Sequence, residues 1–177
     1  MPTRATKAGF IDPMLLLRAD ALPEGANWAY ELKLDGYRAL AIKTGGQVRY
    51  RSRNDNDFNA RYPAIVKAMA PMPDETVIDG EIVALDEAGR PSFSALQNHG
   101  SNGTSLHFFI FDVLILGGRD VMDEPLTRRR ELIEQKVLPP SGGPDPVFAD
   151  PRREPERFDP VRKGTGPRRP CCETPRQ

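Results

Sequence analysis

The sequence predicts an α+β fold, built mainly from antiparallel sheets with flanking helices. Predicted strands arrive in hairpins, most clearly 37–44 and 47–53, which flank a Gly45-Gly46 turn. Predicted helices lie between strands without the regular strand–helix–strand alternation that builds parallel sheets. A length of 177 residues allows about one domain.

Apolar periodicity defines the predicted elements. Apolar runs or alternating residues predict strands at 27–34, 37–44, 47–53, 76–86 and 105–116. Apolar residues at helical spacing predict helices at 58–70, 93–98 and 125–138. Gly80 predicts a bend in its strand, and Thr127 is the predicted cap of the last helix.

The composition changes after Leu138. Residues 139–177 contain ten prolines in 39 residues and almost no apolar periodicity. Such a segment buries too little surface to offset the entropy lost on ordering, so we predict a disordered tail. With eight Lys/Arg and six Asp/Glu, a tail that touches nucleic acid stays open as an alternative. The predicted organisation is a folded domain over 1–138 and a tail over 139–177.

Charge and cysteine content limit the functional classes. Lys+Arg and Asp+Glu each number 25, so net charge gives no overall attraction to nucleic acid or membrane. No run of 18 apolar residues predicts a membrane span. Cys171 and Cys172 are adjacent, without metal-ligand spacing, and are interpreted as reduced thiols. These features predict a cytoplasmic protein.

The stretch ELKLDGYR, residues 31–38, concentrates charge at a predicted strand end. Lys33 lies two residues from an acid on each side, Glu31 and Asp35. A neutral lysine amine is a nucleophile, carboxylates orient an amine or bind Mg²⁺, and Arg38 offers a forked phosphate donor. Gly36 permits close backbone approach to a ligand. Taken alone, the stretch also fits a surface strand end with scattered charges.

The surrounding motifs decide between these two interpretations. KLDGYR resembles the KxDGxR signature of covalent nucleotidyltransferases, which include DNA ligases, RNA ligases and capping enzymes. Further segments resemble ATP-dependent DNA ligases in order, with the closest similarity to the bacterial end-joining type: FIDPML (10–15), YRSRNDNDF (50–58), VIDGEIVALDEAGRPSFSALQ (77–97) and FFIFDVLILGGRDVMDEPLTRRREL (108–132). Together they cover roughly 10–135. The resemblance implies part of the nucleotidyltransferase fold, which is similar to ATP-grasp.

The resemblance implies a nucleophile and a base-binding pair. Lys33 would attack the α-phosphate of ATP and carry AMP as a phosphoramidate. Glu31 would recognise adenine, and Phe111 would stack on its face. From the residue alone, Phe111 also fits an ordinary core position.

The other implied contacts are to phosphate, ribose and metal. Arg38 would contact ribose or phosphate, and Arg53 the nucleotide and later the 5′-phosphate of the nick. Glu81 would hydrogen-bond ribose or help to place Mg²⁺. Considered singly, Arg53 also fits a hairpin charge and Glu81 an exposed strand residue. Asp79, Asp112 and the arginines 128–130 are predicted to have structural roles.

The implied activity is ATP-dependent sealing of nicks in DNA repair and recombination. Nicked or broken double-stranded DNA would be the substrate and end-joining proteins the partners of a monomer that acts at the nucleoid, away from membranes. An RNA ligase or capping-type enzyme, and a non-catalytic nucleotide- or nick-binding fragment, remain alternatives.

The later family motifs are missing from the sequence. The family's Glu-Gly strand and Lys-x-Lys strand have no match after Leu138, and neither does its OB-fold domain. We therefore expect an incomplete adenylation domain, with sequence foreign to the family after Leu138. Weak ligation and an uncovered apolar surface on the strand at 105–116 are the expected consequences.

Overall fold

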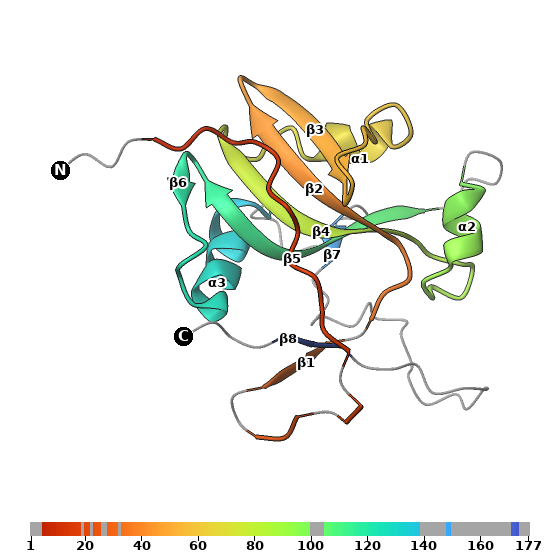
Figure 1. Ribbon diagram of the computed structural model, residues 1–177. Coiled ribbons are helices and arrows are strands. Elements are labelled where there is room, and N and C mark those ends of the chain that lie inside the picture. Colours follow the sequence, from red (N-terminus) through yellow and green to blue (C-terminus); the bar gives the residue numbers. More distant parts are fainter. Residues whose placement is uncertain are drawn as a thin grey trace.

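A twisted antiparallel sheet forms the centre of the computed structural model (Figure 1). The structure describes residues 5–18, 20–21, 23–25, 28–31, 33–99, 105–138, 148–149 and 171–173. The main sheet has the order β3-β2-β4-β5-β6, with β7 paired to β5. The strands are β1 (Ala29–Glu31), β2 (Tyr37–Thr44), β3 (Gln47–Ser52), β4 (Thr76–Ala84), β5 (Leu106–Leu116), β6 (Arg119–Asp120), β7 (Phe148–Ala149) and β8 (Cys171–Glu173).

Among the described residues, three helices flank this sheet: α1 (Pro63–Ala68), α2 (Phe93–Gln97) and α3 (Leu126–Lys136). The α+β prediction is therefore confirmed. The first predicted helix is shorter than 58–70, because the chain turns at Phe58–Tyr62 before Pro63 occupies the first helical position. Thr127 lies inside α3, and Pro125 is its N-cap, so the predicted cap is wrong.

The larger core covers one face of the sheet, which we call the core face. Ala39, Ala41, Ile78 and Ile82 project from β2 and β4 into this core. The buried rings of Tyr50 and Phe108 meet edge-to-face with centroids 5.0 Å apart. Side chains from α1, α2 and α3 close this face, which fixes the register of the strands.

The opposite face, which we call the site face, is covered in part by residues 5–14, the N-terminal strap. Thr6 donates to the Gly118 carbonyl at 2.7 Å, and the Ala8 amide donates to the Glu75 carboxylate at 2.6 Å. Ala8 packs in a second, smaller core with residues of β2, β4 and β5. Figure 1 shows the strap crossing the sheet before the chain enters β1.

The sequence led us to expect an uncovered apolar surface on the strand at 105–116, and this expectation is wrong. None of the β5 residues is exposed, and α3 packs against the strand through Ile133 and its neighbours. The exposed large apolar side chains of the described residues are Phe93 and the run 14–17, where Leu17 is 95% exposed.

Two short strands fall in the region predicted to be a tail. β7 pairs with β5 in parallel, and β8 pairs with β1. β1 is shorter than the predicted strand 27–34. Most of residues 139–177 lie outside the described residues, so the disordered tail stays a prediction.

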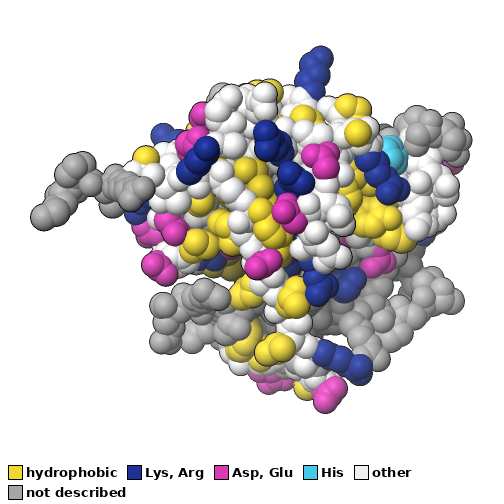
Figure 2. All heavy atoms as spheres, turned by 45° about the horizontal axis from the view of Figure 1, so that its top comes forward, with side chains coloured by type: hydrophobic (Ala, Val, Ile, Leu, Met, Phe, Trp, Pro, Cys, Tyr) yellow, Lys and Arg dark blue, Asp and Glu magenta, His cyan; other side chains and the backbone are white. Residues whose placement is uncertain are grey.

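The surface carries both charge signs. Figure 2 shows Lys and Arg side chains interspersed with Asp and Glu over the visible face, without a large area of one sign. In the part of the chain that the structure describes, no helix has the length and apolar content needed to cross a bilayer.

Candidate functional site

The candidate site is centred on the site face where β2 and β4 run side by side. Arg38 and Glu81 are directly opposite each other in the antiparallel register. Opposed residues project from the same face, so the two side chains are neighbours. Asp79 lies two residues earlier on β4 and therefore on that face too.

A forked ion pair fixes Arg38. Its Nε donates to Oδ1 of Asp79 at 2.9 Å, and one Nη donates to Oδ2 at 2.5 Å. The Asp79 side chain is only 7% exposed. Burial raises the pKa of Asp79, and the Arg38 guanidinium opposes that rise. The pair fixes the rotamer of Arg38, which gives Asp79 the structural role expected from the sequence.

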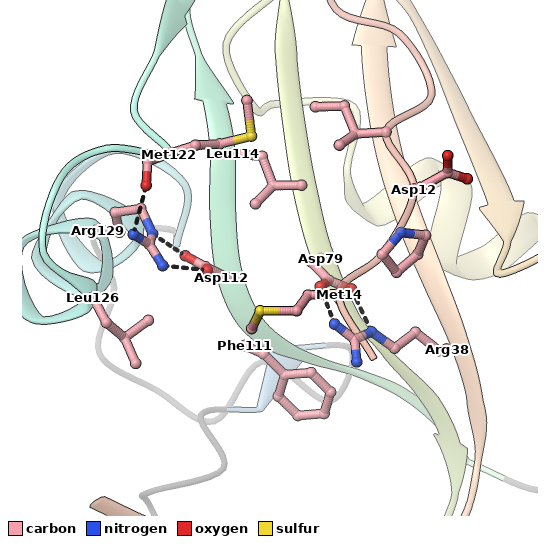
Figure 3. Close-up of a pocket in the computed structure, with 12 residues that line it drawn as sticks. Asp12, Met14, Arg38, Asp79, Phe111, Asp112, Leu114, Met122, Leu126 and Arg129 are labelled. Atoms are coloured by element: carbon pink, nitrogen blue, oxygen red, sulfur yellow. Dashed lines mark hydrogen bonds and ion pairs between the residues drawn. The ribbon is translucent and has the colours of Figure 1, made fainter. Parts of the chain in front are cut away.

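A β-bulge turns Phe111 toward the same face. In the β4–β5 ladder, Asp79 pairs with Asp112 and Gly80 pairs with Ile110, so Phe111 is the extra residue. Ile110 and Val113 both belong to the core face. Phe111 and Asp112, between them, both line a pocket on the site face (Figure 3). Simple alternation would have separated these two side chains.

Lys33 lies at the entrance to β2, five residues before Arg38. Its ammonium donates to Asp35 at 3.3 Å, and these side chains are 58% and 53% exposed. An exposed pair of this kind contributes little to stability. The amine is therefore accessible, and Asp35 is the acid that orients it.

Glu81 lies within electrostatic reach of Lys33. Burial raises the pKa of Glu81 to about 7, against the Gly36 amide hydrogen bond and the positive charges of Lys33 and Arg38. A nearby cation would favour its ionised form. In the described residues, no group of three His, Cys, Asp or Glu side chains forms a ready-made metal site.

Gly36 brings the Lys33 segment against the sheet. A Cβ at Gly36 would lie 2.2 Å from the Ile82 carbonyl oxygen, so no other residue fits without a shift of backbone. Leu34 packs with Val83 and Phe109, and Phe111 contacts this cluster. The close approach expected at Gly36 is thus made to β4, and it brings Lys33 to the same end of the sheet as Glu81 and Phe111.

A second arginine–aspartate pair borders the site. Arg129 of α3 donates to both oxygens of Asp112, at 2.7 and 2.8 Å. Figure 3 shows Phe111 between this pair and the Arg38–Asp79 pair, with Met14 of the strap above the ring. The pocket has a volume of about 140 Å³, which is smaller than the about 300–1,000 Å³ typical of ligand pockets.

Among the described residues, Glu31 makes no hydrogen bond or ion pair with the Lys33 amine. Its carboxylate instead accepts a hydrogen bond from Arg130, across 99 residues of sequence. The two side chains are 14% and 11% exposed, so this is a largely buried ion pair. Of the two acids that flank Lys33 in the sequence, Asp35 is therefore the one that contacts its amine in the described residues.

Arg53 lies at the edge of the site. It is exposed and follows Ser52, whose β2 partner is Ala39, the neighbour of Arg38. The structure thus groups Lys33, Arg38, Glu81 and Phe111, with Arg53 at the adjoining strand end and Glu31 held from α3. The sequence predicted structural roles for Asp79, Asp112, Arg129 and Arg130 but not their partners, because each ion pair joins residues 17 or more positions apart.

Comparison with known proteins places the chain in a family. The family model described as "ATP dependent DNA ligase domain" matches residues 13–152. The chain belongs to the ATP-dependent DNA ligase family. A multifunctional non-homologous end joining protein, LigD, from Pseudomonas aeruginosa is 39% identical over 143 residues, which cover 75% of this chain and 17% of that protein.

A second relative and a solved structure agree. A SPbeta prophage-derived DNA ligase-like protein, LigB, from Bacillus subtilis is 30% identical over 132 residues, which cover 73% of this chain and 48% of the relative. The structure titled "mycobacterial DNA ligase D complexed with ATP and MES" is 42% identical with a TM-score of 0.55, over 60% of this chain and 36% of that one. The chain therefore spans less than half the length of these relatives.

Proposed function

We propose that this chain carries the nucleotidyl-transfer centre of an ATP-dependent DNA ligase that seals nicks in DNA repair and recombination. Lys33 is the residue that becomes adenylated. The observation that carries the proposal is the placement of an accessible Lys33 amine at one sheet end with Glu81, Arg38 and Phe111, in a chain of this family.

In the first step, the lone pair of Lys33 Nζ attacks the α-phosphorus of ATP. An N–P bond forms, the bond from the α-phosphorus to the bridging oxygen breaks, and pyrophosphate leaves with that electron pair. The amine gives up a proton, and Lys33 holds AMP. In ligation, AMP then passes to the 5′-phosphate of a nick, and attack by the 3′-hydroxyl releases it.

The neighbouring side chains have complementary tasks. Arg38, fixed by Asp79, places positive charge beside ribose or phosphate oxygens. Phe111 offers a ring to the adenine face, and Arg53 meets phosphate at the adjoining strand end. Glu31 accepts from the base.

Mg²⁺ fits this arrangement with Glu81 as its protein ligand. Mg²⁺ is commonly held by one or two carboxylates together with substrate phosphates, so a single Glu is compatible. When bound, Mg²⁺ supplies charge neutralisation at the phosphates. Its positive charge would also favour the ionised form of Glu81, whose pKa burial raises to about 7.

A second candidate function is nucleotide or nick binding without adenylation. The absence of Glu-Gly and Lys-x-Lys matches after Leu138 favours it, because those positions supply charge at the metal and the α-phosphate in the family. An RNA ligase or capping-type reaction is distinguished by labelling with GTP in place of ATP.

The wider setting follows from the same proposal. The substrate is nicked or broken double-stranded DNA, the partners are end-joining proteins, and the protein acts as a cytoplasmic, nucleoid-associated monomer. Residues 1–138 form the partial adenylation domain, and 139–177 the tail.

The deciding experiment is incubation with α-³²P-ATP and Mg²⁺, followed by a denaturing gel. We expect a weak covalent band in the wild type, absent in Lys33→Ala and retained in Lys67→Ala, a control on the surface of α1. Nicked-duplex binding without a band in any variant would establish the non-catalytic candidate and refute the adenylation proposal.

A further inference from the structure

Two consecutive arginines of α3 hold acidic residues from two different strands. Arg129 binds Asp112, the neighbour of Phe111 in the β5 bulge. Arg130 binds Glu31 at the end of β1. One helical turn therefore holds both Asp112, the neighbour of Phe111, and Glu31, and the proposed function assigns Phe111 and Glu31 to the purine.

The Arg130–Glu31 ion pair is largely buried and joins distant parts of the chain. Both side chains are largely buried, with exposures of 11% and 14%. Arg128, on the same helix, differs, because it is half exposed and its ion-pair partner among the described residues is the nearby Glu131, at 2.7 Å. A buried guanidinium fixes the direction of a carboxylate more firmly than water does.

Resting on the proposed function, we propose that Arg130 is a positioning residue that makes Glu31 select adenine over guanine. Arg130 donates to Oε1 of Glu31. A carboxylate has about four acceptor positions, so it retains capacity for a second donor.

Adenine presents that second donor. Its amine at C6 can donate to a carboxylate held in place, whereas guanine carries an oxygen at C6 that would face the carboxylate oxygens. A site built to accept a hydrogen bond rejects a ligand that cannot donate it. The selection requires that Glu31 cannot swing aside, and Arg130 prevents that movement.

The test measures ATP and GTP binding by isothermal titration with Mg²⁺ for four proteins: wild type, Arg130→Leu, Arg130→Lys and Arg128→Leu. We expect Arg130→Leu to weaken ATP binding about tenfold or more while GTP binding changes little, so that the preference falls. Arg130→Lys recovers part of the preference, and Arg128→Leu retains all of it. Circular dichroism melts establish that each variant is folded.

The outcomes separate this inference from the proposed function. Equal loss of ATP and GTP binding in Arg130→Leu overturns the positioning role. If Arg130→Leu does not fold, an unchanged preference for ATP over GTP in folded Arg130→Lys overturns it instead. An unchanged preference in folded Arg130→Leu does the same, while Lys33 labelling by ATP would leave the proposed function intact. A wild type that binds neither nucleotide overturns both.

Discussion

The two faces of the main sheet are stabilised by different interactions, although the same strands supply both. The core face is filled by apolar volume, with the Tyr50 and Phe108 rings in edge contact and helices closing over them. The site face carries charged side chains held in pairs, Arg38 with Asp79 and Arg129 with Asp112. Substitutions on the core face should therefore act through volume, and those on the site face through the partner left behind.

Loss of Arg129 tests the site face most severely. We expect Arg129→Met to lower the free energy of unfolding by about 3–5 kcal/mol, because Asp112 is left charged and largely buried without its partner. Urea unfolding measures the change. The exposed control, Arg128→Met, should stay within about 0.5 kcal/mol of wild type, and a matching small effect in Arg129→Met would contradict the comparison.

Added volume tests the core face. A Cβ at Gly80 would lie 2.4 Å from the Phe109 carbonyl oxygen and 2.7 Å from the Phe108 ring, so Gly80→Ala should cost about 1–3 kcal/mol. Gly9→Ala is the matched control, because nothing lies within 4 Å of its Cβ position. Thermal melting compares the two, and an equal melting temperature would show that β4 and β5 separate easily here.

Titration of Glu81 tests burial of charge on the site face. Its pKa in the folded protein is about 7, above its usual value of 4.5, so the folded protein binds more protons between these values. Stability therefore falls as pH rises through this window. Glu81→Gln should be more stable than wild type by about 1–2 kcal/mol at pH 8, allowing for solvent screening.

The comparison with Glu81→Gln is made by urea unfolding without Mg²⁺ at several pH values. The difference should shrink toward zero near pH 4.5, where the wild-type carboxyl is protonated in the folded protein. Glu87→Gln, at an exposed turn, should show no such trend. A constant difference across the pH range would mean that burial does not perturb Glu81.

The smallest effect is expected from a polar atom in the core. The Tyr50 hydroxyl is buried and finds no hydrogen-bond partner among the described residues. Tyr50→Phe should therefore leave stability unchanged or raise it by up to about 1 kcal/mol, since no hydrogen bond is lost. A loss of stability of more than about 1 kcal/mol in Tyr50→Phe, measured by urea unfolding, would reveal a partner for this hydroxyl.

Sequence patterns predicted most of the sheet because its strands have strong local signals. The Gly45-Gly46 turn between alternating segments predicted the β2–β3 hairpin, and the continuous apolar run predicted β5. The bulge at Phe111 was not predicted, because an apolar run carries no polar marker of a change in alternation. The ordered motifs assembled the candidate residues, but no local signal indicates which arginine meets which acid.

Because Phe111 is the extra residue of a bulge, it could be deleted without breaking the pairing of β4 with β5. Because Phe111 has no residue opposite it in β4, deleting it would restore an uninterrupted ladder from Asp79 to Gly80. The strands could keep their pairing, and the large cluster on the core face would keep all of its buried residues. A single codon thus separates a sheet that presents this ring on the site face from a plain one, and the domain could persist after loss of the ring.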